Sequence, residues 1–412
     1  MTTAIKGGKI YKSGAFLPNE LFVVDAREKA GLESETGSDF DFKRVINADN
    51  SFILPSFCDV HVHFREPGQS YKETISTGSM AAAHGGYTTV CTMPNLKPAP
   101  STMDTLRVQL ELIEKDAVIE VVPYGTITME QSGRGKLSDM KALAPHVCAF
   151  SDDGRGVQAD GLMREAMYQA KELGKLIVAH CEDESLLNEG KVRESEWKQI
   201  ERDLKLADET GAGYHVCHIS CKESVEVIRD AKKSGVDVTC ETAPHYLIFD
   251  TSDVEDYIAR CPEYGGRFKM NPPIKDKADR ESLIAGVLDG TVDMIATDHA
   301  PHSAEEKRRG FANSSNGITG LECAFPALYT YLVKTGVMSL EHLLHMMSVA
   351  PRERFGLKQN GWTMVDLEHT YRVDSEDFRS MGKCTPFYGH ILNGKVQMVI
   401  MEGNTVYENL ER

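Results

Sequence analysis

Through the middle of the chain, apolar strand-like runs alternate with stretches of helical periodicity. Short runs rich in β-branched and aromatic residues recur between residues 57 and 297 and predict strands. The predicted strands cover residues 57–64, 87–93, 118–127, 146–151, 175–180, 213–219, 236–241 and 292–297. Residues 74–83 and 194–209 predict helices, and the second places apolar side chains at helical spacing at Trp197, Ile200, Leu204 and Ala207. The alternation is typical of a parallel sheet with crossover helices.

Eight strand–helix units in roughly 300 residues predict an α/β fold of the (β/α)8 TIM-barrel type. We assign this barrel to residues 55–357. A doubly wound open sheet is the alternative architecture, but no Gly-x-Gly-x-x-Gly motif follows a predicted strand.

Both ends of the chain have a different rhythm, with short strand-like runs separated by turn residues. Near the start, strands are predicted at residues 4–11, 21–24 and 44–54, and the acidic stretch 33–41 is predicted to be a solvated loop. Near the end, strands are predicted at residues 363–367, 395–401 and 405–407. Because the two ends resemble each other, we predict that residues 1–54 and 358–412 form one small, β-sandwich-like domain.

Charge and composition narrow the class of partner. The chain has 412 residues and a formal net charge of −16, which argues against nucleic acid as a partner. An anionic substrate would therefore need a local positive charge. The ten cysteines form no Cys-x-x-Cys pair, and no signal peptide or long apolar run is recognisable. We expect a cytoplasmic protein that has no membrane partner. If the protein forms an assembly, we expect a homodimer.

The end of the first predicted barrel strand carries the clearest chemical signal. Asp59, His61, His63 and Arg65 alternate with apolar residues, so their side chains are predicted to share one strand face. Two neutral imidazoles on one face can bind a zinc ion, and an arginine beside them suits a carboxylate. Taken alone, the pattern also fits two core histidines and a surface arginine.

Other predicted strands end in polar residues of the same kinds. They contribute Asn95, Asp152, Asp153, His180, His215, His218, Glu241, Asp298 and His302. Each one alone is a common rim residue, turn or helix cap. Because reactive residues of a parallel barrel gather where the strands end, their joint recurrence predicts a shared site for two metal ions.

Strand alternation sets further expectations for this site. His215 and His218 are three residues apart, so only one should enter the barrel, and we choose His218, which is nearer the strand end. Asp152 and Asp153 are similarly alternatives. The thiols of Cys181, Cys217 and Cys240 adjoin candidate site residues and should point away from the site.

The predicted residues suit the hydrolysis of an amide, or its formation in reverse. Zinc lowers the pKa of bound water from about 15.7 towards about 7, which supplies hydroxide near neutral pH. An aspartate such as Asp298 at the last strand end can take a proton from that hydroxide and pass it to a leaving nitrogen.

The motifs together resemble one enzyme family. They are DxHxHxREPG at residues 59–68, MPN at 93–95, SDDG at 151–154, HxxHxS at 215–220, NPP at 271–273 and TDHAPH at 297–302. This set resembles the bacterial metal-dependent dihydroorotases of the amidohydrolase superfamily, from about residue 50 to the C-terminus. The resemblance implies reversible, zinc-dependent cyclisation of N-carbamoyl-L-aspartate to L-dihydroorotate in pyrimidine biosynthesis.

The resemblance also implies roles for individual residues. One zinc would be bound by His61, His63 and Asp298, a second by His180 and His218, and Asp153 would bridge the two ions, although one ion per subunit is also compatible with the sequence. Asp298 would act as the general acid/base. The substrate would be held by Arg65, Asn95, Asn271 and His302, and residues 303–320 are predicted to form a loop near the site.

Two alternatives remain open from the sequence. The first is another cyclic amidase, such as a dihydropyrimidinase, hydantoinase or allantoinase. Those enzymes use a carboxylated lysine at the end of strand four, where this chain has Ser151, Asp152 and Asp153. The second is a non-catalytic scaffold homologue, but such proteins typically lose metal ligands, whereas this chain keeps the whole candidate set.

Overall fold

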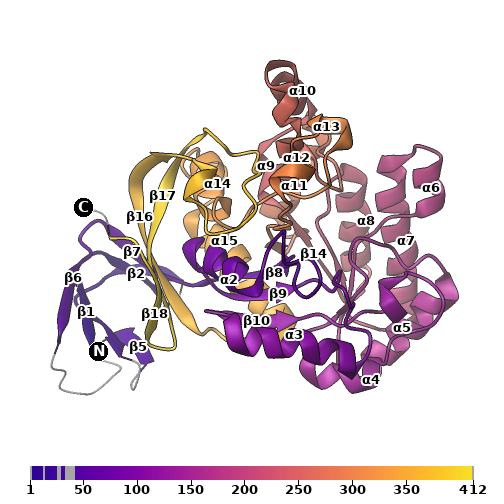
Figure 1. Cartoon of the computed structure of the whole chain (residues 1–412), viewed down its shortest axis with the longest axis horizontal. Helices are drawn as coiled ribbons and strands as arrows, with labels where there is room; N and C mark the ends of the chain where they lie inside the picture. Colours follow the sequence, from indigo (N-terminus) through magenta and orange to yellow (C-terminus); the bar gives the residue numbers. More distant parts are fainter. Residues whose placement is uncertain (1, 13, 26–28, 33–41, 411–412) are drawn as a thin grey trace.

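The computed structural model describes residues 2–12, 14–25, 29–32 and 42–410. Figure 1 shows helices surrounding a strand layer at the centre and right of the view, and a β-rich part at the left that contains both chain ends. The predicted loop at residues 33–41 lies outside the described residues. Within those residues, no helix combines the length and the apolar character that crossing a membrane requires.

All eight strands predicted for the central region are present as short parallel strands. They are β8 (Phe57–Val62), β9 (Tyr87–Thr92), β10 (Glu120–Pro123), β11 (Phe150–Ser151), β12 (Ile177–Ala179), β13 (Tyr214–Val216), β14 (Val238–Thr242) and β15 (Met294–Ile295). They form two parallel sheets, ordered β10-β9-β8 and β11-β12-β13-β14-β15. Parallel bridges from Val62 to His299 and from Gly125 to Phe150 link the two sheets at both edges.

Helices connect these strands and cover them. The longer helices are α2 (Ile75–His84), α3 (Met103–Asp116), α5 (Asp160–Glu172), α7 (Val192–Thr210), α8 (Lys222–Lys233), α10 (Thr251–Arg260) and α11 (Lys277–Asp289). The shorter ones are α4 (Met140–Leu143), α6 (Glu184–Asn188), α9 (Pro244–Ile248), α12 (Ala304–Lys307), α13 (Gly310–Asn313), α14 (Ala324–Leu328), α15 (Leu340–Leu344) and α16 (Ala350–Phe355). Thr74 caps α2 by accepting from the Thr77 amide.

The helix predicted at residues 194–209 corresponds to α7 and differs from the prediction in its buried face. Ile200, Leu204 and Ala207 are buried as predicted, whereas Trp197 is only half-buried. Glu196 is buried instead, and its carboxylate accepts hydrogen bonds from Ser220 and Ser224 and pairs with Lys275 at 2.9 Å. A buried carboxylate is tolerated here because it is paired and hydrogen-bonded.

The two chain ends contribute to the same sheets. One sheet has the order β5-β4-β1-β6, and the other has the order β18-β17-β16-β7-β2-β3. Their strands are β1 (Thr3–Lys6), β2 (Lys9–Lys12), β3 (Ala15–Pro18), β4 (Phe22–Asp25), β5 (Lys29–Leu32), β6 (Arg44–Asn47), β7 (Ser51–Pro55), β16 (Gly361–Arg372), β17 (Ile391–Met401) and β18 (Asn404–Glu408). β7 pairs antiparallel with β16, and Figure 1 shows the indigo and yellow strands side by side.

Two N-terminal strand predictions were too long. Residues 4–11 form two strands because Gly7 and Gly8 both have positive φ, which turns the chain between β1 and β2. Residues 44–54 also divide, because a turn in which the Ser51 amide donates to the Ala48 carbonyl separates β6 from β7.

Six of the eight central strands, all except β11 and β14, end earlier than predicted, and this shortening positions the polar residues. β8, β12 and β13 stop at Val62, Ala179 and Val216, just before His63, His180 and His218. Arg65, His218 and Asp298 have φ of 58°, 32° and 48°. Non-glycine residues rarely adopt this left-handed region, and such backbone is concentrated at functional sites. The chain therefore turns sharply where the candidate site residues occur.

Candidate metal centre

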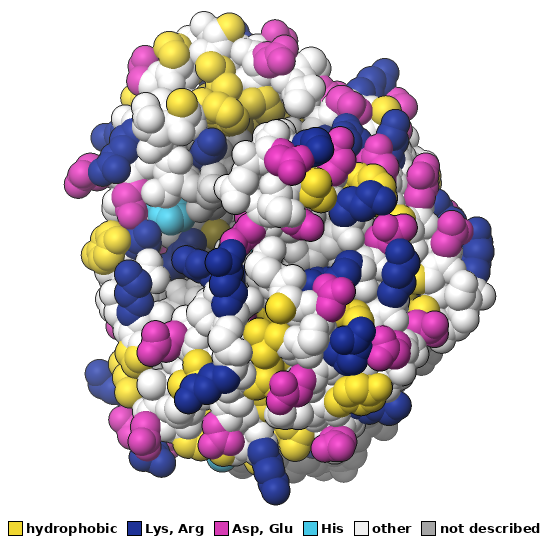
Figure 2. All heavy atoms as spheres, turned by 90° about the vertical axis from the view of Figure 1, so that its right-hand side faces the viewer, with side chains coloured by type: hydrophobic (Ala, Val, Ile, Leu, Met, Phe, Trp, Pro, Cys, Tyr) yellow, Lys and Arg dark blue, Asp and Glu magenta, His cyan; other side chains and the backbone are white. Residues whose placement is uncertain are grey.

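A polar cavity of about 340 Å³ lies where the parallel strands end. Every residue to which the family resemblance gave a role, except His61, lines it; these residues are His63, Arg65, Asn95, Asp153, His180, His218, Asn271, Asp298 and His302. His61 is fully buried beneath the cavity and contacts Asp153. The face drawn in Figure 2 has a hollow in which a histidine is visible among lysine and arginine side chains. The tertiary structure thus gathers residues from six of the eight strand ends.

The backbone around His61 is held by Asp59. The Asp59 carboxylate accepts hydrogen bonds from the amides of His61 and Thr297, and so ties the end of β8 to the end of β15. Burial raises the pKa of Asp59 to about 7 against these hydrogen bonds, which lower it. Asp59 therefore fixes where the His61 and Asp298 segments meet and does not itself line the cavity.

Hydrogen bonds on the far ring nitrogens orient His61 and His63. His61 Nδ1 lies 2.6 Å from Glu241 Oε1, and His63 Nδ1 lies 2.8 Å from Asn95 Oδ1. Both oxygens can only accept, so each Nδ1 carries a proton, and Nε2 is the nitrogen of each ring that is left to bind a metal ion through its lone pair. Carboxylate and amide partners of this kind typically orient histidines that bind metals.

The two Nε2 lone pairs converge on carboxylate oxygens. His61 Nε2 lies 3.3 Å from Asp153 Oδ1 and 3.6 Å from Asp298 Oδ1, and His63 Nε2 lies 3.1 Å from Asp298 Oδ1. Lone pairs and carboxylate oxygens repel one another unless a cation or a proton lies between them. These atoms can therefore hold one metal ion.

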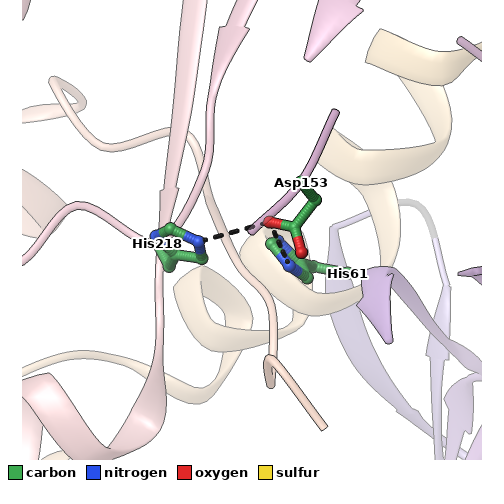
Figure 3. Close-up of side chains that lie close together, drawn as sticks. All are labelled: His61, Asp153 and His218. Carbon is green, nitrogen blue, oxygen red and sulfur yellow. Dashed lines mark ion pairs between the residues drawn. The ribbon is translucent and has the colours of Figure 1, made fainter. Parts of the chain in front are cut away.

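Asp153 also faces a second pair of histidines. Its Oδ1 lies 3.6 Å from His218 Nε2 and 3.8 Å from His180 Nδ1, and the two histidine nitrogens are 3.0 Å apart. Figure 3 shows His61 and His218 next to the Asp153 carboxylate, each with a ring nitrogen joined to the same carboxylate by a dashed line. The position of Asp153 between the two groups suits a carboxylate that bridges two ions.

The donor set fits zinc in chemistry and spacing. Nitrogen ligands about 2.05 Å from a tetrahedral zinc ion lie roughly 3.4 Å apart, which is close to the separations between these candidate ligands. Among the described residues, the buried atoms His61 Nε2 and Asp153 Oδ1 have no hydrogen-bond partner. Although burial acts in the opposite direction, the charges of Asp153 and Glu241 raise the pKa of His61. Burial raises the pKa of Asp153, but the charge of His61 lowers it, and the pKa lies well below its ordinary value.

Two expectations based on strand alternation were wrong. His215 and His218 both point into the interior: His215 lies within β13 with its Nε2 3.2 Å from Glu241 Oε2, and His218 follows the strand with a positive φ that redirects its side chain. The Cys217 thiol does not point away, because its sulfur lies beside His61 and Glu241. Alternation predicts side-chain direction only as long as the strand continues.

The two neighbouring aspartates have different environments. Asp152 is turned away from the cavity and accepts hydrogen bonds from the amides of Ile127, Thr128 and Gly133. Burial raises its pKa to about 6, against these hydrogen bonds. The structure therefore places Asp153, and not Asp152, among the candidate ligands.

The opposite side of the cavity is cationic. Arg65 is 7% exposed, and its Nε donates to the Pro301 carbonyl. Within the described part of the chain, its guanidinium forms no ion pair with a carboxylate. A buried charge without a counterion is costly, so this wall is suited to an anion brought by the substrate. His302 lies 3.4 Å from Arg65, between their nearest nitrogens.

The structure adds residues for which the sequence analysis assigned no role. Glu182 accepts from Asn271 at 2.7 Å and lies 3.4 Å from His180 Nε2, so it leaves His180 Nδ1 facing Asp153. Lys72 lies against His302, and Glu241 against His61. Glu182 is two residues after His180, which was a usable signal, whereas nothing in the local sequence around Lys72 indicates its contact.

The predicted loop at residues 303–320 contains α12 and α13 and borders the cavity with Asn316 and Gly317. Lys307 is 3% exposed, and its Nζ donates to the carbonyls of Lys269, Ser315 and Gly317. One buried ammonium group thus connects residues 303–320 to the segment around Lys269.

Comparisons with known sequences agree on one family. A family model described as dihydro-orotase-like matches residues 50–224. The chain is 44% identical to the dihydroorotase of Fusobacterium nucleatum, with 99% of each chain covered. It is 46% identical to the dihydroorotase of Enterococcus faecalis, with 98% of each chain covered, and 44% identical to that of Bacillus licheniformis, with 92% of each covered.

Solved structures provide a comparison of the fold alone. The L-hydantoinase (dihydropyrimidinase) of Arthrobacter aurescens superimposes with a TM-score of 0.85 at 24% identity, over 99% of this chain and 96% of that one. The dihydropyrimidinase of Brevibacillus agri gives a TM-score of 0.83 at 22% identity, over 99% and 95%.

Proposed function

The chain belongs to the dihydroorotase family, whose members are hydrolases acting on cyclic amides, and we propose that it uses zinc at the centre described above. The reaction would be the reversible cyclisation of N-carbamoyl-L-aspartate to L-dihydroorotate in pyrimidine biosynthesis. One observation carries this proposal: histidine lone pairs and carboxylates converge on one side of a cavity, and the other side holds the buried Arg65, which has no carboxylate partner among the described residues.

We propose His61, His63 and Asp298 as ligands of one zinc ion, His180 and His218 as ligands of a second, and Asp153 as the bridge. When bound, zinc polarises a carbonyl and lowers the pKa of a coordinated water to about 7. Asp298 borders the cavity, and its Oδ1 lies close to both His61 and His63. This position supports a role as the general acid/base that carries a proton to the leaving nitrogen.

The cationic wall would recognise the substrate carboxylate. Arg65 offers a planar fork of donors, and His302 lies beside it. The Asn95 amide oxygen is occupied by His63, which leaves its NH2 group, 3.5 Å from Asp153, directed towards the cavity. Asn271 lines the cavity while donating to Glu182, and we propose it as a further substrate contact.

The geometry favours this substrate over the neutral rings of other cyclic amides. Among the described residues that line the cavity, Lys72 is the only lysine. It lies in the segment after β8 and not at the end of β11. Asp153 stands at the end of β11, where a carboxylated lysine would be needed. The buried Arg65 also favours a substrate with a free carboxylate.

We also propose a (β/α)8 barrel at residues 55–357 and a small β-sandwich-like domain at residues 1–54 and 358–412. The cyclic order of strand pairings from β8 to β15, with bridges at both sheet edges, supports the barrel. Side chains from both chain ends, such as Ile5, Ile53, Met364 and Ile400, pack in one core cluster and support the second domain. The ten unpaired cysteines support a cytoplasmic location. A homodimer stays a prediction.

Ultraviolet-monitored hydrolysis of L-dihydroorotate, before and after chelation and with zinc added back, tests the proposal. We expect activity to be lost on chelation and restored by zinc. Dihydrouracil serves as the control substrate. A preference for dihydrouracil would contradict the proposed substrate, and activity that survives complete metal removal would contradict the metal centre.

A further inference from the structure

Lys72 is a buried lysine at the edge of the cationic wall. It is 8% exposed and lies in the segment between β8 and α2. Its Nζ lies 3.2 Å from His302 Nδ1 and 2.9 Å from Glu306 Oε1. Glu306 is itself held by the amide and hydroxyl groups of Ser303, with which it caps α12. Lys72 is thus placed between an imidazole and a fixed carboxylate.

The contacts of His302 assign its proton. His302 Nε2 lies 2.7 Å from the Asn316 carbonyl oxygen, which can only accept, and 3.4 Å from Arg65 Nη2, which can only donate. The Asn316 contact is much the shorter, so Nε2 carries a hydrogen. Burial, together with the charges of Arg65, Lys72 and Lys307, lowers the pKa of His302 to about 3. The ring is therefore neutral, its Nδ1 has a lone pair, and Lys72 donates a hydrogen bond to it.

Without Lys72, the surroundings of the ring would favour the opposite tautomer. Glu306 Oε2 lies 3.5 Å from His302 Nδ1 and would attract a proton to that nitrogen. Nε2 would then present a lone pair to the cavity, where a substrate carboxylate could only be repelled. The hydrogen bond made by one ring nitrogen thus decides whether the other is a donor or an acceptor.

We propose that Lys72 is a positioning residue that fixes the proton of His302 on Nε2, so that His302 presents an N–H donor to the substrate carboxylate. The inference rests on the proposed function, in which Arg65 and His302 bind that carboxylate. Arg65 and His302 line the same cavity as Asn316, so a bound carboxylate would compete with the Asn316 carbonyl for this donor.

The test combines tautomer and kinetics in the zinc-loaded enzyme. Nitrogen-15 spectra of histidine-labelled protein without substrate report which ring nitrogen carries the proton, and the His302 signals are assigned by their loss in His302→Gln. In Lys72→Met, we expect the proton to move to Nδ1 and the KM for L-dihydroorotate to rise about tenfold or more, with a smaller change in kcat. In the double variant Lys72→Met with Glu306→Gln, the new amide can donate to Nδ1. It should therefore restore both the tautomer and the KM.

Lys275→Met is a matched control, because the Lys275 side chain is 8% exposed and pairs with Glu196 at the same 2.9 Å. It should lose stability without changing the tautomer of His302, and circular dichroism of all variants checks that they fold. An unchanged His302 tautomer in Lys72→Met, or no recovery in the double variant, overturns the inference. If the tautomer moves but the KM does not, Lys72 still positions the ring, and the proposed contact of His302 with the carboxylate is the part that fails.

Discussion

Two sides of the cavity present opposite kinds of polar group. We call them the floor, which is formed by the candidate metal ligands, and the wall, which is the cationic side that contains Arg65. On the floor, ring nitrogens of His61, His63 and His218 direct lone pairs at the carboxylates of Asp153 and Asp298. On the wall, Arg65 donates to the Pro301 carbonyl and has no carboxylate partner among the described residues, while Lys72 donates to His302 and also pairs with Glu306. The floor thus has an excess of acceptors and the wall an excess of donors. This contrast is what the proposed function requires, with a cation held on the floor and an anion held beside the wall.

Replacement of Asp298, the proposed general acid/base, should reduce activity more than any other change. For Asp298→Asn we expect kcat to fall by about 10³-fold or more, because an amide cannot shuttle a proton, while most of the metal stays bound. Steady-state assays with metal analysis on the same sample measure both quantities. Asp203→Asn is the control, since Asp203 is also buried but contacts Tyr214 and Arg202 away from the cavity. Near-normal turnover in Asp298→Asn would remove the assigned role.

The next largest effect should be weaker zinc binding when His61 loses its hydrogen-bond partner Glu241. Glu241→Gln replaces the acceptor of the His61 Nδ1 proton and of His215. Groups that orient metal ligands typically contribute 10–100-fold to affinity, so we expect zinc to bind about 10–100-fold more weakly. Competition with a chelator measures this change. Glu196→Gln is the matched control, because Glu196 is also buried but touches no candidate ligand. An equal loss in both variants would contradict a specific role for Glu241.

The wall should affect substrate binding more than metal binding. Arg65→Lys keeps the charge but loses the planar fork, so we expect the KM for L-dihydroorotate to rise about tenfold while zinc affinity stays unchanged. Arg352→Lys is the comparison: Arg352 is 4% exposed but donates to the carbonyls of Ser56, Phe57 and Ser348, outside the cavity. An unchanged KM in Arg65→Lys would exclude Arg65 from the carboxylate site.

A buried ion pair outside both halves should leave activity nearly unchanged and alter stability alone. Although burial raises the pKa of Glu196, Lys275 and Ser220 lower it to about 2, below its ordinary value of 4.5. The folded state therefore gains stability above pH about 4.5 and loses it as the pH falls towards 2. Glu196→Gln should be less stable by about 3 kcal/mol near pH 7. Urea unfolding should show the difference from the wild type shrinking as the pH falls. A pH-independent difference would contradict the ionised pair.

Local pattern was sufficient for much of the fold and for the candidate ligands. The eight central strands and α7 correspond to runs of apolar residues, because burying an apolar face is what these elements share. His61, His63 and Asp298 could be named because metal-capable residues directly follow or end such runs. The strand boundaries were less predictable, since β11 and β15 contain only two residues each.

Other features depended on contacts between distant segments. Lys72 and Glu306 are far apart in the sequence and meet only because β8 and β15 are neighbours through the Val62–His299 bridge. The choice between Asp152 and Asp153 followed from which carboxylate could accept the amides of Ile127 and Thr128. His215 and His218 both face inward because the backbone turns at His218. The alternation of side chains along a strand cannot predict where the backbone leaves the strand and turns.

The sequence by itself therefore determined which residue types stand at the strand ends, and with them the class of chemistry, because metal ligands and carboxylate-binding residues are few and recognisable. Only the tertiary structure decided which nitrogens of His61, His63 and His302 carry a proton and which carboxylate faces the candidate metal centre. Those outcomes depend on partners such as Glu241, Asn95, Glu182 and Lys72, whose positions are set by packing across the molecule.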